Sequence, residues 1–180
     1  DLQKDRDPFA LEMLAAVLDG HDASRFSKNL VRGSRIAQSA GAGFDGSLRG
    51  EATFIIDGQP AEGKTVAELE AALRAEIRRI QDEGVSAEEL ARVKTQAIAA
   101  QTYKRDSLMA QAMEIGGAEA SGIHWRDIDT LLEKLKTVTA EEVQAVAKKY
   151  FTDDTLTVAV LDPQPVEQSK PRRPSGAVRH

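Results

Sequence analysis

Residues 20–57 restrict the possible fold most, because their residue types are too particular for generic packing. Asp22 and Ser24 each carry a side-chain oxygen that can accept an unpaired backbone N–H, so a short helix is predicted to begin there. The helix is predicted to end near Gly33, since glycine tolerates the left-handed conformation that terminates many helices. Three basic residues fall on adjacent turns of this helix: Arg25, Lys28 and Arg32.

A β-hairpin is predicted directly after the basic helix. Residues 36–43 combine Ile36 with small residues in an extended pattern, and residues 46–50 form a turn bounded by glycines. Residues 51–57 are predicted to be the second strand, and residues 58–63, which contain two glycines and a proline, a loop. The sequence therefore predicts a basic helix joined without a linker to two antiparallel strands.

Helices are predicted over most of the remaining chain. Three begin with a capping box, in which a hydroxyl and a carboxylate three residues later each satisfy a backbone donor: Thr65 with Glu68, Ser86 with Glu89, and Thr139 with Glu142. The predicted helices cover residues 7–18, 65–84, 86–115, 125–135 and 139–150, and the third is expected to end at Gly116-Gly117. Residues 155–161 are rich in β-branched residues and predict an inner strand. The fold class is α+β, a mostly antiparallel sheet with helices on one face.

Composition excludes several classes of protein. The chain has 180 residues, of which 41% are hydrophobic and 29% charged, and no apolar run reaches 18 residues, so a folded domain is predicted and membrane insertion is not. The formal charge of −5 gives no electrostatic reason to expect nucleic acid as a partner. Cysteine is absent, so neither a disulfide nor a thiolate site can form.

Several short motifs occur in a particular order. The patterns Ser-Arg-Leu, Leu-x-Arg-Glu, Gly-Leu-Ala-Tyr-Ser and Gly-x-Ser-x-x-Glu-Leu-x-x-x-Lys are approximated at residues 24–26, 30–32, 35–39 and 84–94. In these motifs the chain resembles the C-terminal, non-catalytic domain of the insulinase/pitrilysin-type zinc metallopeptidases, which include the mitochondrial processing peptidases. The resemblance covers residues 1–163 and implies one half of a clam-shaped peptidase, without the strands that precede the first helix in family members. Residues 164–180 form a basic, proline-containing tail that is predicted to be disordered.

The resemblance implies a substrate-binding role for Arg32, Gln38 and Arg35. In family members an arginine at the position of Arg32 and a tyrosine at the position of Gln38 reach the substrate backbone near the zinc of the N-terminal domain. Arginine suits this role because its fork donates several hydrogen bonds to carbonyl or carboxylate oxygens. Glutamine can donate and accept as well, but it lacks the acidic hydroxyl and the ring of tyrosine. The alternative is that Arg32 and Arg35 pair with surface carboxylates; Arg25 is expected to be structural.

No catalytic or metal-binding residue is predicted in this chain. Its histidines, His21, His124 and His180, are too far apart in sequence for the His-x-x-Glu-His pattern of the family. No Gly-x-Ser-x-Gly motif indicates a nucleophilic serine, and no glycine-rich stretch is followed by the Lys-Ser/Thr of a phosphate loop. His21 is expected to serve a loop or cap, and Trp125 to be a partly buried anchor. The resemblance therefore places the zinc cofactor in a partner.

Two functions lead. The first is the non-catalytic half of a zinc-dependent peptidase, which closes over an extended peptide while a domain or subunit of the same family supplies the zinc and the general base. The second is a catalytically dead scaffold or peptide-binding assembly subunit. A helical regulator unrelated to the family is a third alternative, favoured if the hairpin does not pack against the helix after Ser86. The resemblance suggests a bacterial periplasm or cell envelope, and a cytoplasmic location stays open.

Overall fold

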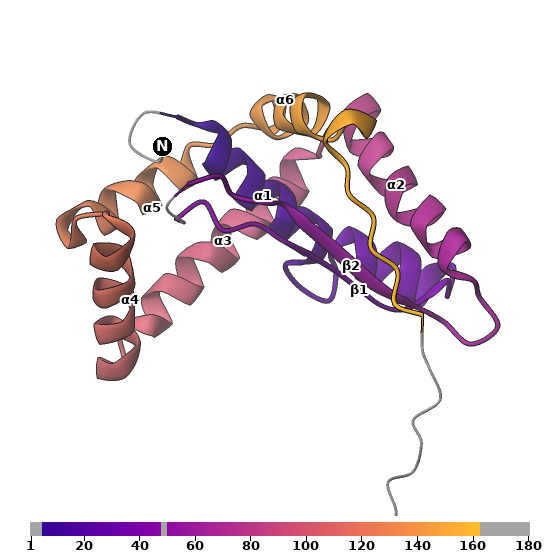
Figure 1. Cartoon of the computed structure of the whole chain (residues 1–180). Coiled ribbons are helices and arrows are strands. Elements are labelled where there is room, and N and C mark those ends of the chain that lie inside the picture. The colour runs from indigo at the N-terminus through magenta and orange to yellow at the C-terminus, as the bar shows by residue number, and fades with distance from the viewer. Residues whose placement is uncertain (1–4, 48–49, 163–180) are drawn as a thin grey trace, which may run out of the picture.

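The computed structural model describes residues 5–47 and 50–162 and confirms the α+β class (Figure 1). Helices predominate, and the described residues form one antiparallel sheet of two strands. The elements in chain order are α1 (Asp7–Asp19), the π-helix η1 (Phe26–Gly33), β1 (Ala37–Gly43), β2 (Ile55–Pro60), α2 (Val66–Glu83), α3 (Ala87–Lys104), α4 (Leu108–Ser121), η2 (Trp125–Asp127), α5 (Ile128–Lys136), α6 (Ala140–Tyr150) and η3 (Asp153–Thr155).

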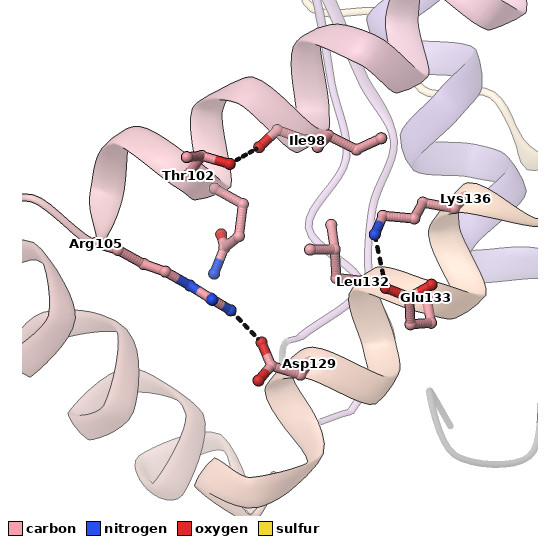
Figure 2. A pocket seen from close by; sticks show the side chains of 8 residues that line it. Ile98, Thr102, Arg105, Asp129, Leu132, Glu133 and Lys136 are labelled. Carbon is pink, nitrogen blue, oxygen red and sulfur yellow. Dashed lines mark hydrogen bonds and ion pairs between the residues drawn. The ribbon is translucent and has the colours of Figure 1, made fainter.

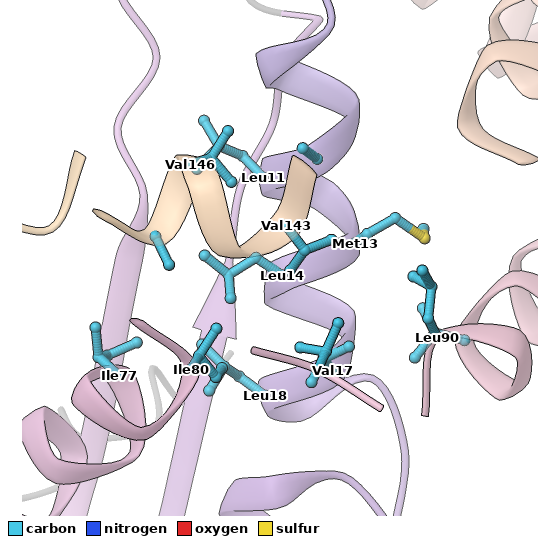
Figure 3. Packing of buried hydrophobic residues seen from close by; sticks show 14 of the residues in the cluster. Leu11, Met13, Leu14, Val17, Leu18, Ile77, Ile80, Leu90, Val143 and Val146 are labelled. Atoms are coloured by element: carbon cyan, nitrogen blue, oxygen red, sulfur yellow. The ribbon is translucent and has the colours of Figure 1, made fainter. Parts of the chain in front are cut away.

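Helix α1 forms the centre of the hydrophobic core. Its predicted wide apolar stripe is confirmed, because eight of its residues are buried: Phe9, Ala10, Leu11, Met13, Leu14, Ala15, Val17 and Leu18. Figure 3 shows side chains from α1, α2, α3 and α6 meeting around Leu14 and Leu18, both of which are fully buried. A helix that is apolar on most of its surface is stable only when other elements cover it. The other helices and the hairpin therefore assemble around α1.

The hairpin is confirmed, but its second strand is displaced along the chain from the predicted residues 51–57. β1 pairs antiparallel with β2 so that Ala40 faces Gly58 and Gly41 faces Asp57. A side chain at Gly58 would come within 3.1 Å of Leu69 and 3.2 Å of the Ser39 carbonyl, so a larger residue would require these neighbours to shift where the strand meets α2. Gly58, which predicts a loop, thus lies within a strand where the backbone comes close to Leu69 and Ser39. The hairpin packs chiefly against α1, η1 and α2, rather than against α3 as expected.

The long helix predicted from Ser86 to Ile115 is wrong, because the chain breaks after Lys104 and begins a second helix, α4. Ser107 caps α4 by accepting a hydrogen bond from the backbone N–H of Ala110 at 3.2 Å. Gly116 and Gly117 lie inside α4, which ends instead at Gly122, whose φ of 82° is the left-handed conformation of a helix terminator. Apolar spacing continues across the break, so periodicity alone does not reveal it.

The inner strand predicted over residues 155–161 is also wrong. Residues 156–162 belong to no strand, and their apolar side chains are exposed, from 46% for Leu156 to 88% for Leu161. β-Branched composition favours an extended backbone, but a strand also needs a neighbour to complete its hydrogen bonds. Within residues 5–47 and 50–162, β1 and β2 pair only with each other. None of the helices in these ranges is long and apolar enough to span a membrane.

Candidate functional site

The π-helix η1 is anchored on one side and exposed on the other. Phe26 and Leu30 point into the core and are 0% and 4% exposed. On the same side, Asn29 donates a hydrogen bond of 3.1 Å to the buried Glu76 carboxylate of α2. These contacts fix the orientation of η1 against α1 and α2, so the residues on its outer side keep a constant position relative to the core.

Arg25, the residue before η1, is structural as expected. Its guanidinium holds Glu89 of α3 in a two-point contact of 2.9 and 3.0 Å and also donates to the Gly84 carbonyl at 3.1 Å. The hydrogen bonds from Arg25 outweigh the effect of burial and, with the Ser86 N–H, lower the pKa of Glu89 to about 2. This pair ties the start of η1 to the loop between α2 and α3.

The basic helix begins directly after Ser24 and ends at Gly33, close to the predicted bounds, but the predicted capping interactions at both ends are wrong. Neither Asp22 nor Ser24 caps η1, and the Ser24 hydroxyl is buried without a hydrogen-bond partner in the described chain. Gly33 does not adopt a positive φ; a side chain there would lie 2.9 Å from the Lys28 carbonyl, which is the close approach that the wider π turn imposes. The left-handed residue is Arg35, with a φ of 51°. The sequence gives no signal for the π geometry.

The structure places the three predicted substrate-binding residues on one short exposed segment between η1 and β1. Arg32 lies on the last turn of η1 and donates a hydrogen bond to the Asp22 carbonyl oxygen. Arg35 follows η1, and Gln38 lies near the start of β1. All three are exposed. In the chain described here, neither arginine forms an ion pair with a carboxylate, so the alternative in which both arginines pair with surface carboxylates finds no support.

Three unusual backbone features coincide on this segment, which we call the η1–β1 junction (residues 32–39). The last turn of η1 is a π turn, closed by a 2.9 Å hydrogen bond from the Ser34 N–H to the Asn29 carbonyl. Arg35 has a positive φ, and the strand register shifts between Ala37 and Ser39, so Gln38 is the extra residue of a β-bulge. π turns, left-handed residues other than glycine, and bulges are each uncommon and occur often at functional sites.

The residues that the structure describes do not assemble a zinc site. Nowhere in the described ranges do three or more histidine, aspartate or glutamate side chains come together as metal ligands. The Nδ1 atom of His21 accepts a 2.8 Å hydrogen bond from the backbone N–H of Ala23. The Nδ1 atom of His124 accepts one of 3.1 Å from the backbone N–H of Arg126. Both imidazoles thus serve local turns. Trp125 is 46% exposed, and its ring contacts its neighbours His124 and Arg126, so the expected partly buried anchor is not confirmed.

A groove between α3 and α5 is the first of two hollows that sequence reasoning missed. Figure 2 shows Arg105, which follows α3, reaching Asp129 of α5, with Lys136 paired to Glu133 beside them. Because these four charges are paired with one another, the groove offers no free charged group for a ligand. Leu132 and Gln101 separate it from a second hollow on the side of α1 and α4.

Comparisons with known proteins agree with the fold. The family model of the peptidase M16 inactive domain matches residues 1–97. No curated protein sequence matches the chain. A protease from Helicobacter pylori is similar with a TM-score of 0.78 and 18% identity over 84% of this chain, which spans 36% of that protein's chain.

Two Bordetella structures are similar over most of their length. A candidate zinc protease from Bordetella pertussis Tohama I has a TM-score of 0.73 and 19% identity, and the alignment covers 86% of this chain and 84% of that one. The inactive peptidase domain of a candidate zinc protease from Bordetella parapertussis has a TM-score of 0.74 and 19% identity, with 91% and 88% covered. At these identities the likeness establishes the fold.

Proposed function

The chain belongs to the peptidase M16 inactive-domain family, and from this premise we propose that it binds an extended peptide at the η1–β1 junction as the non-catalytic half of a zinc-dependent peptidase. Zinc and the general base come from a partner domain or subunit of the same family, since the described residues gather no set of metal ligands and the sequence has no His-x-x-Glu-His motif. Peptide hydrolysis therefore requires both halves.

The observation that carries this proposal is the exposed hydrogen-bonding capacity that Arg32, Arg35 and Gln38 keep free on one segment. Arg32 uses part of its hydrogen-bonding capacity on the Asp22 carbonyl, and a guanidinium has five N–H donors, so others stay available to a peptide. The Arg35 and Gln38 side chains form no hydrogen bond or ion pair within the described residues. Exposed polar groups close together on one short segment suit the recognition of main-chain carbonyls, because several donors can reach the same peptide.

The hairpin supplies a second means of holding an extended peptide. In the sheet that the structure describes, β1 and β2 pair only with each other, so each strand has one edge without a strand neighbour. A peptide that adds to such an edge is held by main-chain hydrogen bonds, which tolerate many sequences. The β-bulge at Gln38 interrupts regular pairing near the start of β1, so a peptide on β1 would meet the polar side chains of the junction at that end.

Replacing Arg32 with alanine is expected to weaken the binding of an unstructured, fluorescently labelled peptide by roughly tenfold, because one charge-assisted hydrogen bond contributes about 1.5 kcal/mol. Arg78→Ala is the matched control: Arg78 is an exposed arginine of α2 that forms no ion pair within the described residues. Fluorescence anisotropy measures both. Arg32→Lys should recover only part of the loss, since lysine keeps the charge but not the fork.

Equal losses for Arg32→Ala and Arg78→Ala would contradict the proposal, because a general loss of positive charge would then explain both. Undiminished binding by Arg32→Ala would contradict it as well. Those results would favour the scaffold function, for which the specific observation is Gln38, a residue without the phenol that family members carry at the corresponding position.

A further inference from the structure

An open cleft lies between α1, α3, α4 and α5, away from the residues of the η1–β1 junction. Its volume is about 470 Å³, which is within the range of natural ligand sites, roughly 300–1,000 Å³. Its apolar lining comes from all four helices: Phe9 of α1, Ala97 of α3, Met113 and Ala118 of α4, and Leu131 and Leu135 of α5. The cleft is therefore a surface on which apolar groups from distant parts of the chain converge.

The helices that border the cleft leave apolar surface uncovered. No residue of α4 or α5 is fully buried, although both helices contribute apolar side chains to the cleft. Met113 faces the cleft with 70% of its surface exposed. Methionine side chains are flexible and polarizable, and grooves between helices that contain them accept aliphatic side chains of peptides.

The rim of the cleft carries an excess of negative charge. Among the residues that line it, Glu12, Asp45 and Glu114 face one basic residue, Lys104. Lys104 is already paired with Glu114 at 3.5 Å, and Gln101 donates to both oxygens of the same carboxylate at 2.9 and 3.1 Å. Asp45 accepts hydrogen bonds from the Ser47 N–H and hydroxyl. Lys104, the basic residue among those that line the cleft, is thus paired with Glu114, and no lining residue balances the charges of Glu12 and Asp45.

Glu12 is the residue for which this imbalance matters most. It interrupts the apolar surface of α1, is partly buried, and forms no hydrogen bond or ion pair within the described residues. Burial, and secondly the charge of Asp45, raise the pKa of Glu12 to about 7. A cation placed beside this carboxyl would favour its ionised form. Lys134 also lies near the cleft, with its ammonium 5.8 Å from the centre of the Phe9 ring.

We propose that this cleft binds a polypeptide segment in which an aliphatic side chain lies next to a lysine or arginine. The aliphatic group occupies the space between α3, α4 and α5, and the basic group lies between Glu12 and Asp45. The negative charge at the rim favours a positively charged ligand. The apolar floor of the cleft provides most of the contact area. The inference does not rest on peptide binding at the η1–β1 junction.

The experiment compares two matched probes, acetyl-Leu-Lys-Leu-amide and acetyl-Leu-Glu-Leu-amide, by NMR of the methionine methyl groups. The chain contains three methionines, which are assigned by Met→Leu substitution: Met113 in the cleft, Met109 exposed on the same helix, and Met13 in the core. The lysine probe should shift the Met113 resonance saturably and leave those of Met109 and Met13 in place. The glutamate probe should bind about three- to fivefold more weakly, as expected for one partly exposed charge pair.

Glu12→Gln tests the charge at a constant side-chain shape. This variant should bind the two probes with similar affinity, whereas Glu62→Gln, in an exposed loop, should keep the preference of the wild type. Raising the pH from 6 to 8 ionises Glu12 and should strengthen binding of the lysine probe to the wild type but not to Glu12→Gln. A cooperative urea transition like that of the wild type shows that the variant is folded.

The proposal is overturned if neither probe shifts Met113 saturably, if both bind the wild-type chain equally, or if Met109 responds as strongly as Met113. Each of these results can be read from the wild-type chain alone, so the test does not depend on the folding of Glu12→Gln.

Discussion

Replacing Phe26 with alanine is expected to lower the free energy of unfolding by about 3–5 kcal/mol, the usual range for a fully buried phenylalanine. Phe26 is 0% exposed and is the first residue of η1, so its ring connects the η1–β1 junction to the core. The loss has two parts: the favourable free energy of burying the ring disappears, and the cavity left behind costs packing contacts. Urea denaturation followed by far-ultraviolet circular dichroism measures it.

Tyr103→Ala is the control for Phe26→Ala, because Tyr103 is also aromatic but 73% exposed. Its effect should stay within about 0.5 kcal/mol. A loss below about 1 kcal/mol for Phe26→Ala would mean that η1 is not packed on the core as described, since burial of the ring would then contribute little.

Replacing Arg25 with alanine is expected to cost about 2–3 kcal/mol at pH 7, because Glu89 and the Gly84 carbonyl lose a shared, mostly buried donor. The folded state lowers the pKa of Glu89 to about 2 from an ordinary value of 4.5, so this stabilisation is complete above pH 4.5. It is lost as the pH falls through about 2. The difference between wild type and variant should therefore narrow below pH 4.5 in urea denaturation at several pH values.

Arg92→Ala is the control for Arg25→Ala, because Arg92 also pairs with a glutamate of α3. Arg92 pairs with Glu88 four residues earlier, and both side chains are well exposed, at 40% and 84%. This pair should contribute no more than about 0.5 kcal/mol. If Arg25→Ala and Arg92→Ala destabilise the chain equally, Arg25 does not anchor η1 in the way its contacts indicate.

Features with local causes are predicted well from the sequence. The capping boxes at Thr65, Ser86 and Thr139 are all confirmed, since each consists of hydrogen bonds between residues three apart. The wide apolar stripe of α1 likewise predicts its burial. In these cases the side chains that decide the structure are close together in the sequence.

Features that depend on distant parts of the chain are predicted poorly. The second strand is displaced because pairing with β1 decides which residues form it, and residues 155–161 are no strand because pairing needs a neighbour that composition cannot reveal. The break after Lys104 depends on one capping serine, Ser107, in an otherwise continuous apolar pattern. Tertiary contacts override the local preference in the first two cases, and a local cap overrides periodicity in the third.

The candidate site was accessible from the sequence only in part. Arg32, Arg35 and Gln38 were singled out by resemblance, and their roles in binding stay predictions. The π turn and the bulge that arrange them leave no trace in residue types. Glu12 could have been noticed as a lone carboxylate within the apolar run of α1. Its neighbour Asp45 comes from the hairpin, and that proximity is a property of the fold.

The most direct test of the shared-site account is an affinity capture from source-cell extract, with the wild-type chain, Arg32→Ala and Arg78→Ala as parallel baits. The captured fractions are assayed for cleavage of unstructured peptides with and without a zinc chelator. The account predicts chelator-sensitive cleavage with wild-type and Arg78→Ala baits, and a rate about tenfold lower with Arg32→Ala, because one transition-state hydrogen bond is lost. Captured fractions without chelator-sensitive cleavage, or an Arg32→Ala rate equal to that of the wild type, would contradict it.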